Sequence, residues 1–195
     1  MPDIANDVHR IAVKVPLANP EALDPDALIP VFHGWIRDGG VADGLLIDVA
    51  DYKHVPDGPG IMLIGLEWDR SVDYGYGTAG VMSVAKRGLD GDLASRIRAV
   101  AADAYRTAAT LAASEWAGPS AAVRTDELEI LLLDRLNAPN TPKTLAAAAP
   151  VIAEALAPLG EVGAPEQLGD ERRPFRVRLT LGSAATASEL AASLS

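Results

Sequence analysis

Cysteine is absent from this chain of 195 residues. Its absence excludes disulfides, thiolate metal sites and a cysteine nucleophile. Aromatic residues make up only 5%, so the core must consist of aliphatic and small side chains. Basic residues are also scarce, with 17 Lys and Arg against 27 Asp and Glu and a net charge of -10 at pH 7. Because this charge repels polyanions at long range, we expect neither a nucleic acid nor a membrane as partner.

Long hydrophobic runs are lacking as well. The most apolar stretch, 144–160, is rich in alanine and contains Glu154 and two prolines, so it is too weakly hydrophobic to span a bilayer. The first residues are acidic and carry no apolar run of the signal-peptide kind. We therefore expect a cytosolic, cytoplasmic protein.

Apolar residues make up 49% of the chain, which is enough to build a folded core. Hydrophobic alternation or short apolar runs predict strands at 11–17, 45–49, 61–68, 79–86, 128–133 and 175–181. Helical spacing predicts helices at 24–37, 92–115 and 141–160, and 69–78 is expected to be a turn. The prediction is a single α+β domain over 1–182, with a mixed sheet of about six strands and about three helices on one face. The Ala/Ser-rich segment 183–195 is a C-terminal helix or a tail, and a docking helix for a larger assembly is a further alternative.

Side-chain patterns refine two of these helices. Asp24-Pro25 is a helix start of the cap-plus-proline kind, and Gly39-Gly40 is a stop. The expected buried stripe of this first helix is Leu28, Val31, Phe32 and Trp35. The residues of the longest helix that fall off its apolar stripe, and should face solvent, are Arg96, Arg98, Asp103 and Arg106.

Two parts of the chain follow a similar plan. A strand at 11–17 and another at 127–135 each precede a capped helix that contains an internal Pro-Val pair, and each helix leads to a later strand. This pattern predicts an internal β-α-β duplication. The alternative is a coincidence in a chain rich in proline and alanine.

The sequence Gly75-Tyr-Gly-Thr-Ala-Gly80 matches the glycine spacing of dinucleotide-binding loops. Such a loop needs a helix directly after it, so that a phosphate meets the helix N-terminus. Here an apolar, β-branched run follows, so we interpret the segment as a turn.

The richest polar segment follows the strand at 45–49 and contains Asp48, Asp51, His54 and Asp57. Histidine exchanges protons near neutral pH, and a neighbouring carboxylate can orient its ring, so His54 with Asp48 or Asp51 is a candidate acid/base site. The same side chains offer mixed nitrogen and oxygen ligands to a divalent metal. The alternative is a tight turn whose carboxylates cap backbone N–H groups.

A second polar run, 134–141, leaves a strand and enters a helix. Arg135 can bind a carboxylate, while Asn137 and Asn140 can fix a ligand or the loop itself. Ordinary capping with an Asp–Arg pair is the alternative. Further along, Arg176 and Arg178 share a strand face and are expected to be solvated or to meet a carboxylate-rich partner.

The runs 46–54 and 55–65, with 124–128 and 134–141, resemble a family of bacterial proteins of about this length and of unknown function. The most specific part is Asp51-Tyr-Lys-His-Val-Pro-Asp-Gly-Pro-Gly60. The resemblance implies that 48–60 and 134–141 are the recognisable features of the family, but it supplies no activity. The family pattern has a histidine after Gly65 where this chain has Leu66, so no second histidine accompanies His54.

We therefore expect a binding or accessory protein for a small-molecule ligand or a protein partner, with self-association as an option. Loop 51–60 and the residues Arg135, Asn137 and Asn140 would line one shared hollow. The alternative is a small enzyme that uses His54 with Asp48 or Asp51. The pattern specifies no cofactor and no particular metal.

Overall fold

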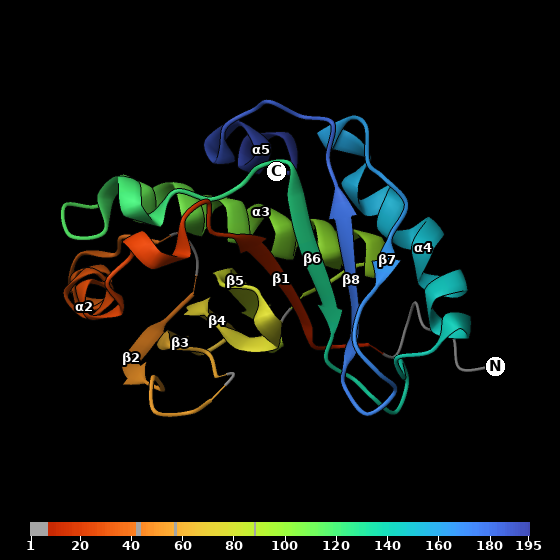
Figure 1. Ribbon diagram of the computed structural model, residues 1–195, viewed down its shortest axis with the longest axis horizontal. Coiled ribbons are helices and arrows are strands. Elements are labelled where there is room, and N and C mark those ends of the chain that lie inside the picture. Colours follow the sequence, from red (N-terminus) through yellow and green to blue (C-terminus); the bar gives the residue numbers. More distant parts are fainter. Residues whose placement is uncertain (1–7, 42–43, 57, 88) are drawn as a thin grey trace.

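The computed structural model describes residues 8–41, 44–56, 58–87 and 89–195. Within these residues the chain has an α+β architecture, with one eight-stranded sheet and four α-helices (Figure 1). The strands are β1 (Ile11–Pro16), β2 (Leu46–Asp51), β3 (Ile61–Gly65), β4 (Trp68–Asp73), β5 (Gly80–Ala85), β6 (Glu127–Leu132), β7 (Glu166–Gln167) and β8 (Phe175–Thr180). The α-helices are α2 (Leu28–Asp38), α3 (Leu93–Ala112), α4 (Pro142–Leu156) and α5 (Ala187–Ser193). Five single turns of 3₁₀-helix join them: η1 (Pro20–Ala22), η2 (Pro25–Ala27), η3 (Gly75–Gly77), η4 (Gly118–Ala121) and η5 (Ala157–Leu159).

The strand order is β2-β3-β4-β5-β1-β6-β8-β7, and every neighbouring pair is antiparallel. The predicted mixed sheet of about six strands and three helices is therefore corrected in strand number, strand direction and helix number. The predicted duplication is not confirmed. Strands β1 and β2 lie apart in the sheet with three strands between them, whereas β6 and β8 pair directly.

Strand β4 occupies the first half of the segment 69–78, which we predicted as a turn. Its sequence is polar, so no hydrophobic alternation marks it as a strand. Its charged side chains find partners on other elements, in the pairs Asp69–Lys86, Arg70–Asp103 and Asp73–Lys14. Because these partners are distant in sequence, a local pattern cannot reveal that the polar strand is buried. The strand at 79–86 consequently pairs with β4 rather than with β3.

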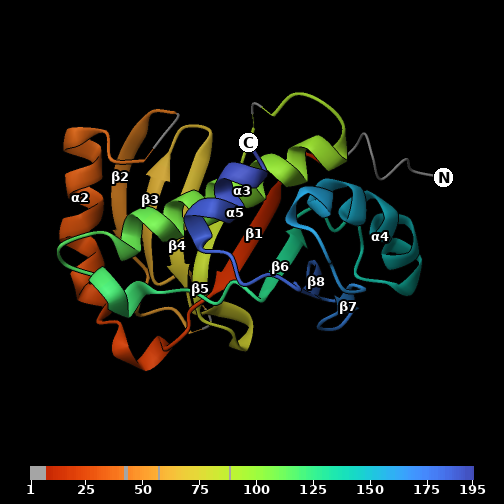
Figure 2. The same ribbon diagram turned by 90° about the horizontal axis from the view of Figure 1, so that it is seen from above.

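The helices cover one face of the sheet, with α2 over the β2 end, α3 and α5 over the centre and α4 over the β8 end (Figures 1 and 2). The first helix buries Leu28, Val31, Phe32 and Trp35, as the periodicity predicts. It ends at Gly39, which adopts φ 72° as the left-handed C-cap. A smaller apolar cluster lies on the opposite face.

Two predictions about the covering helices need revision. Arg96 and Asp103 of α3 are buried rather than solvated, because Arg96 donates to the Val8 carbonyl and Asp103 accepts a bidentate pair from Arg70. The segment 183–195 forms α5, which begins with a capping box between Thr186 and Glu189. Its apolar residues pack into the main core against α3, so this face is not available as the docking surface that the sequence left open. Across the described ranges, no helix has the length and apolar character needed to cross a membrane.

Strand direction decides which connections can meet. Because neighbours alternate in direction, β1, β2 and β4 all run the same way and end at the same edge of the sheet. Three of the connections that leave from that edge are η1 and η2 after β1, loop 52–60 after β2, and η3 after β4. Figure 2 shows these segments along one side of the sheet.

Candidate functional site

Asp48 and Asp51 satisfy their own backbone. The Asp48 carboxylate accepts the N–H of Val49 at 2.8 Å, and Asp51 accepts the N–H of Lys53 at 2.9 Å. Both side chains belong to exposed residues, and the Lys53 N–H holds the pKa of Asp51 below its usual value. This is the capping geometry of the turn alternative.

Asp48 also protects the edge of the sheet. The N–H of Tyr52 donates to the Gly60 carbonyl in the β2–β3 ladder, and such groups alternate along a strand. The N–H of Val49 therefore points to the outer side of β2, where Asp48 accepts it. An edge N–H that is already bonded is a poor template for another strand.

His54 is exposed at the end of the same turn, and its ring stacks near Tyr52 with 6.4 Å between centroids. Asp57 lies outside the described residues. Among the residues that are described, no group of three or more His, Cys, Asp or Glu side chains is placed to hold a metal ion. The acid/base and metal interpretations of His54, Asp48 and Asp51 therefore stay predictions.

The second predicted segment ties down its own chain. Asp134 accepts the N–H groups of Leu136 and Asn137 and the amide of Asn137, and these bonds lower the pKa of Asp134. Asn140 is buried, and its amide donates to the carbonyls of Leu168 and Asp170. Asn140 thus fastens the entry of α4 to the loop beside β7. Arg135 is exposed.

The expected shared hollow between these two segments is wrong. Loop 52–60 leaves β2 at one edge of the sheet, whereas 134–141 leaves β6, which runs in the opposite direction and lies well across the sheet from β2. The hollow required both segments to reach the same edge, and strand order and direction prevent this.

A buried polar network, which the sequence did not indicate, crosses the face of the sheet opposite the helices. The ammonium of Lys14 on β1 is fully buried and forms an ion pair with Asp73 on β4. It also donates to the carbonyls of Gly75 and Thr78, both at 2.9 Å. Burial lowers the pKa of Lys14 and raises the pKa of Asp73, and their attraction opposes both shifts.

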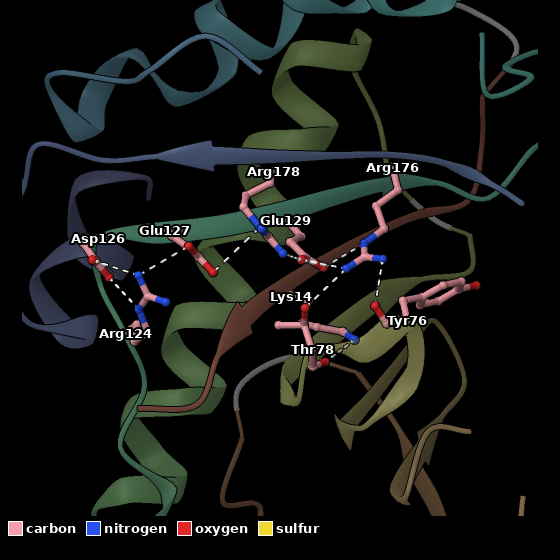
Figure 3. A network of polar contacts seen from close by, with 9 residues as sticks. All are labelled: Lys14, Tyr76, Thr78, Arg124, Asp126, Glu127, Glu129, Arg176 and Arg178. Atoms are coloured by element: carbon pink, nitrogen blue, oxygen red, sulfur yellow. Dashed lines mark hydrogen bonds and ion pairs between the residues drawn. The ribbon is translucent and has the colours of Figure 1, made fainter. Parts of the chain in front are cut away.

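The network continues on β6 and β8 (Figure 3). Glu129 is fully buried and accepts two hydrogen bonds from Arg176, at 2.9 and 2.7 Å, and one from Arg178 at 3.3 Å. Arg176 also donates to the Tyr76 carbonyl and lies over the Tyr76 ring, 5.2 Å from its centroid. Arg176 is buried, not solvated as predicted, because the 75–78 turn lies over it.

We call this set, Lys14, Asp73, Glu129, Arg176, Arg178 and the 75–78 turn, the Lys14 network. It holds Tyr76 at φ 63°, a left-handed conformation that is rare outside glycine. The side-chain charges pair with one another, and Lys14 and Arg176 also bond to carbonyls of the turn. The network therefore fastens the turn after β4 to the sheet.

Two adjoining hollows lie at the edge where β1, β2 and β4 end. The first has a volume of about 360 Å³ and the second about 530 Å³. The first is lined by Pro25, Tyr52, Lys53, Val55, Pro56, Gly58, Gly60 and Tyr74. The second is lined by Pro20, Glu21, Leu23, Pro25, Tyr74, Gly77 and Ala79. Because they share Pro25 and Tyr74, we treat them as one feature, the Tyr74 groove.

Tyr74 is one of the two residues that line both hollows. Its hydroxyl is buried and has no hydrogen-bond partner among the described residues. Burial raises the pKa of Tyr74, and the carboxylates of Asp24 and Glu21 raise it further. The hydroxyl therefore keeps its proton and remains a donor. The ring fits closely against Gly60, where a Cβ would come within 2.8 Å of the Tyr74 ring.

Charges around the Tyr74 groove are mostly acidic. Asp24 caps η2 by accepting the Asp26 N–H, and Glu21 lies in the wall of the second hollow. Lys53, in the wall of the first hollow, forms ion pairs with both Asp26 and Asp51. Two carboxylates thus pair with the single cation of Lys53. The acidic side chains around the groove therefore outnumber the basic ones.

No protein-family model matches the chain, and a search of curated proteins finds no match. The resemblance of 48–60 to an uncharacterised bacterial family therefore stays a prediction.

Proposed function

We propose that this chain is a binding protein, and that the Tyr74 groove recognises a small ligand or a short segment of a partner. The observation that carries the proposal is the Tyr74 hydroxyl, a buried donor without a partner in the described residues. Buried polar groups in native proteins are nearly always hydrogen-bonded, because an unpaired one costs free energy. A ligand acceptor that reaches the hydroxyl from the groove would complete this bond.

The walls of the groove fit binding better than catalysis. They consist mainly of proline, tyrosine, valine and glycine, and the one cation of the first hollow is held by two carboxylates. Concave sites with apolar walls and a few directed polar groups are typical of ligand recognition. A cytosolic location, a ligand other than nucleic acid and a capacity for self-association are further predictions of this proposal.

Amide NMR spectra of isotope-labelled protein, recorded with a library of small neutral and cationic fragments, test the proposal. We expect fragments to shift the signals of Gly58, Gly60 and Gly77 in the groove. Tyr74→Phe should weaken the binding of these fragments. The matched control is Leu136→Ala, at an exposed residue of the 134–141 segment, which should leave their binding unchanged. Shifts confined to the 134–141 segment, or no shifts with any fragment, would overturn the proposal.

A further inference from the structure

The Tyr74 groove is elongated. Its two hollows meet at Pro25 and Tyr74, and they continue from the 52–60 loop on one side to η1 and Ala79 on the other. A compact molecule would fill one hollow and leave the other empty. An extended chain would follow both and pass the Tyr74 side chain, which the two hollows share.

The lining favours flat, rigid groups. Proline rings come from Pro20, Pro25 and Pro56, and aromatic rings come from Tyr52 and Tyr74. Proline-rich segments dock into grooves of this kind because their polyproline II helix is already extended and loses little entropy on binding. That helix has no internal hydrogen bonds, so its carbonyls are free to accept from a donor such as the Tyr74 hydroxyl.

The charges select among such segments. Asp24 and Glu21 are close enough to raise the pKa of Tyr74, so their negative charge is felt at the centre of the groove. Lys53 does not offset them, because Asp26 and Asp51 already pair with it. The chain as a whole carries a net charge of -10. Complementarity therefore favours a cationic side chain in the bound segment.

We infer that the Tyr74 groove binds an extended, proline-containing protein segment that carries arginine or lysine. This inference rests on the proposed function and names the class of partner. A proline ring packs between Tyr52 and Tyr74, a backbone carbonyl accepts from the Tyr74 hydroxyl, and the cation lies beside Glu21 and Asp24.

Fluorescence anisotropy with a labelled synthetic peptide of repeated Pro-Pro-Arg units tests the inference. The wild-type protein should bind it, and raising the salt concentration should weaken the binding. Tyr74→Phe should weaken it by about fivefold to tenfold, the loss of one hydrogen bond. The double variant Glu21→Gln/Asp24→Asn should weaken it by about tenfold at low salt. Leu136→Ala should bind like wild type.

Two altered peptides separate the parts of the inference. Replacing the prolines by alanine, or the arginines by glutamate, should each abolish measurable binding. Binding that survives either replacement, or that Tyr74→Phe and the double variant leave unchanged, would overturn the inference.

The fragment experiment distinguishes this failure from failure of the proposed function. If fragments shift Gly58, Gly60 and Gly77 but the peptide does not bind, the groove is a ligand site and only the partner class is wrong. If no fragment shifts the signals of these glycines and the peptide does not bind, both proposals fail.

Discussion

The Lys14 network and the Tyr74 groove lie next to each other, joined by the turn that follows β4. They differ in whether their central buried polar group has a hydrogen-bond partner. In the network, the Lys14 ammonium contacts three acceptors and Glu129 contacts two guanidinium groups. In the groove, the Tyr74 hydroxyl contacts no acceptor among the described residues.

This difference helps to distinguish buried polar groups that stabilise the fold from those that can bind a ligand. Shifted pKa values often mark functional sites, but ion pairs that only stabilise a fold shift them as well. The pKa values of Lys14 and Asp73 are shifted, yet their hydrogen bonds are already used to hold the 75–78 turn. We therefore assign a structural role to the network, because its hydrogen bonds hold the 75–78 turn, and propose a binding role for the groove, because its unpaired donor belongs to a side chain that lines both hollows.

The largest expected effect is in the Lys14 network. Glu129→Ala removes the acceptor of Arg176 and Arg178 and leaves the buried Arg176 guanidinium without a carboxylate partner. We expect the free energy of unfolding to fall by about 3–5 kcal/mol, measured by urea denaturation. The control is Glu166→Ala on β7, an exposed glutamate, which should change it by less than about 0.5 kcal/mol. Equal losses in the two variants would contradict a structural role for the network.

Lys14→Met sharpens the comparison through its pH dependence. The variant leaves the Asp73 carboxylate buried without its cation, so we expect a loss of about 3 kcal/mol at neutral pH. Burial already raises the pKa of Asp73, and removing Lys14 takes away the attraction that lowers it. The folded variant then binds a proton more tightly than the unfolded chain does.

Its deficit relative to wild type should consequently shrink as the pH falls from neutral through the raised pKa of Asp73 towards the ordinary value of the carboxyl. Urea denaturation at a series of pH values measures this. Lys53→Met, which removes an exposed cation, is the control and should behave like wild type at every pH. A deficit for Lys14→Met that is constant with pH would show that Asp73 does not carry the effect.

A smaller effect concerns the ionisation of Tyr74. Burial and the carboxylates of Asp24 and Glu21 raise its pKa, so its phenolate should appear at a higher pH than that of free tyrosine. Glu21→Gln/Asp24→Asn should move this titration down. The ultraviolet absorbance of tyrosinate, taken as wild type minus Tyr74→Phe, measures it. An unchanged titration in the double variant would remove the argument that these carboxylates reach the centre of the groove.

Local sequence patterns predicted α2, α3 and α4 but understated the number of helices, and they predicted the sheet only in part. The buried stripe of α2 and the Thr141-Pro142 start of α4 follow from spacing and capping within a few residues. Strand β4 was missed because its polar side chains are buried against residues distant in sequence, such as Lys14 and Asp103. Arg176 was predicted to be solvated for the same reason, since its partners Glu129 and Tyr76 belong to other elements.

The candidate site was only partly predictable. The 51–60 loop drew attention through its aspartates and His54, and its Tyr52, Lys53 and Val55 do line the groove. Tyr74 was passed over, because its importance depends on β1, β2 and β4 ending at one edge of the sheet. Strand order is a property of the whole fold and cannot be derived from local sequence. The incorrect prediction that this loop shares a hollow with 134–141 has the same cause.

The most direct test of the account is the effect of Tyr74→Phe on stability without ligand, measured by urea denaturation beside Tyr105→Phe. Both changes delete one buried hydroxyl that lacks a partner among the described residues. Each should raise the free energy of unfolding by about 1 kcal/mol, opposite in sign to the network variants. Only Tyr74→Phe should also weaken the binding of ligands to the groove. A Tyr74→Phe protein that is less stable than wild type would contradict the account, because the hydroxyl would then already have a partner in the fold.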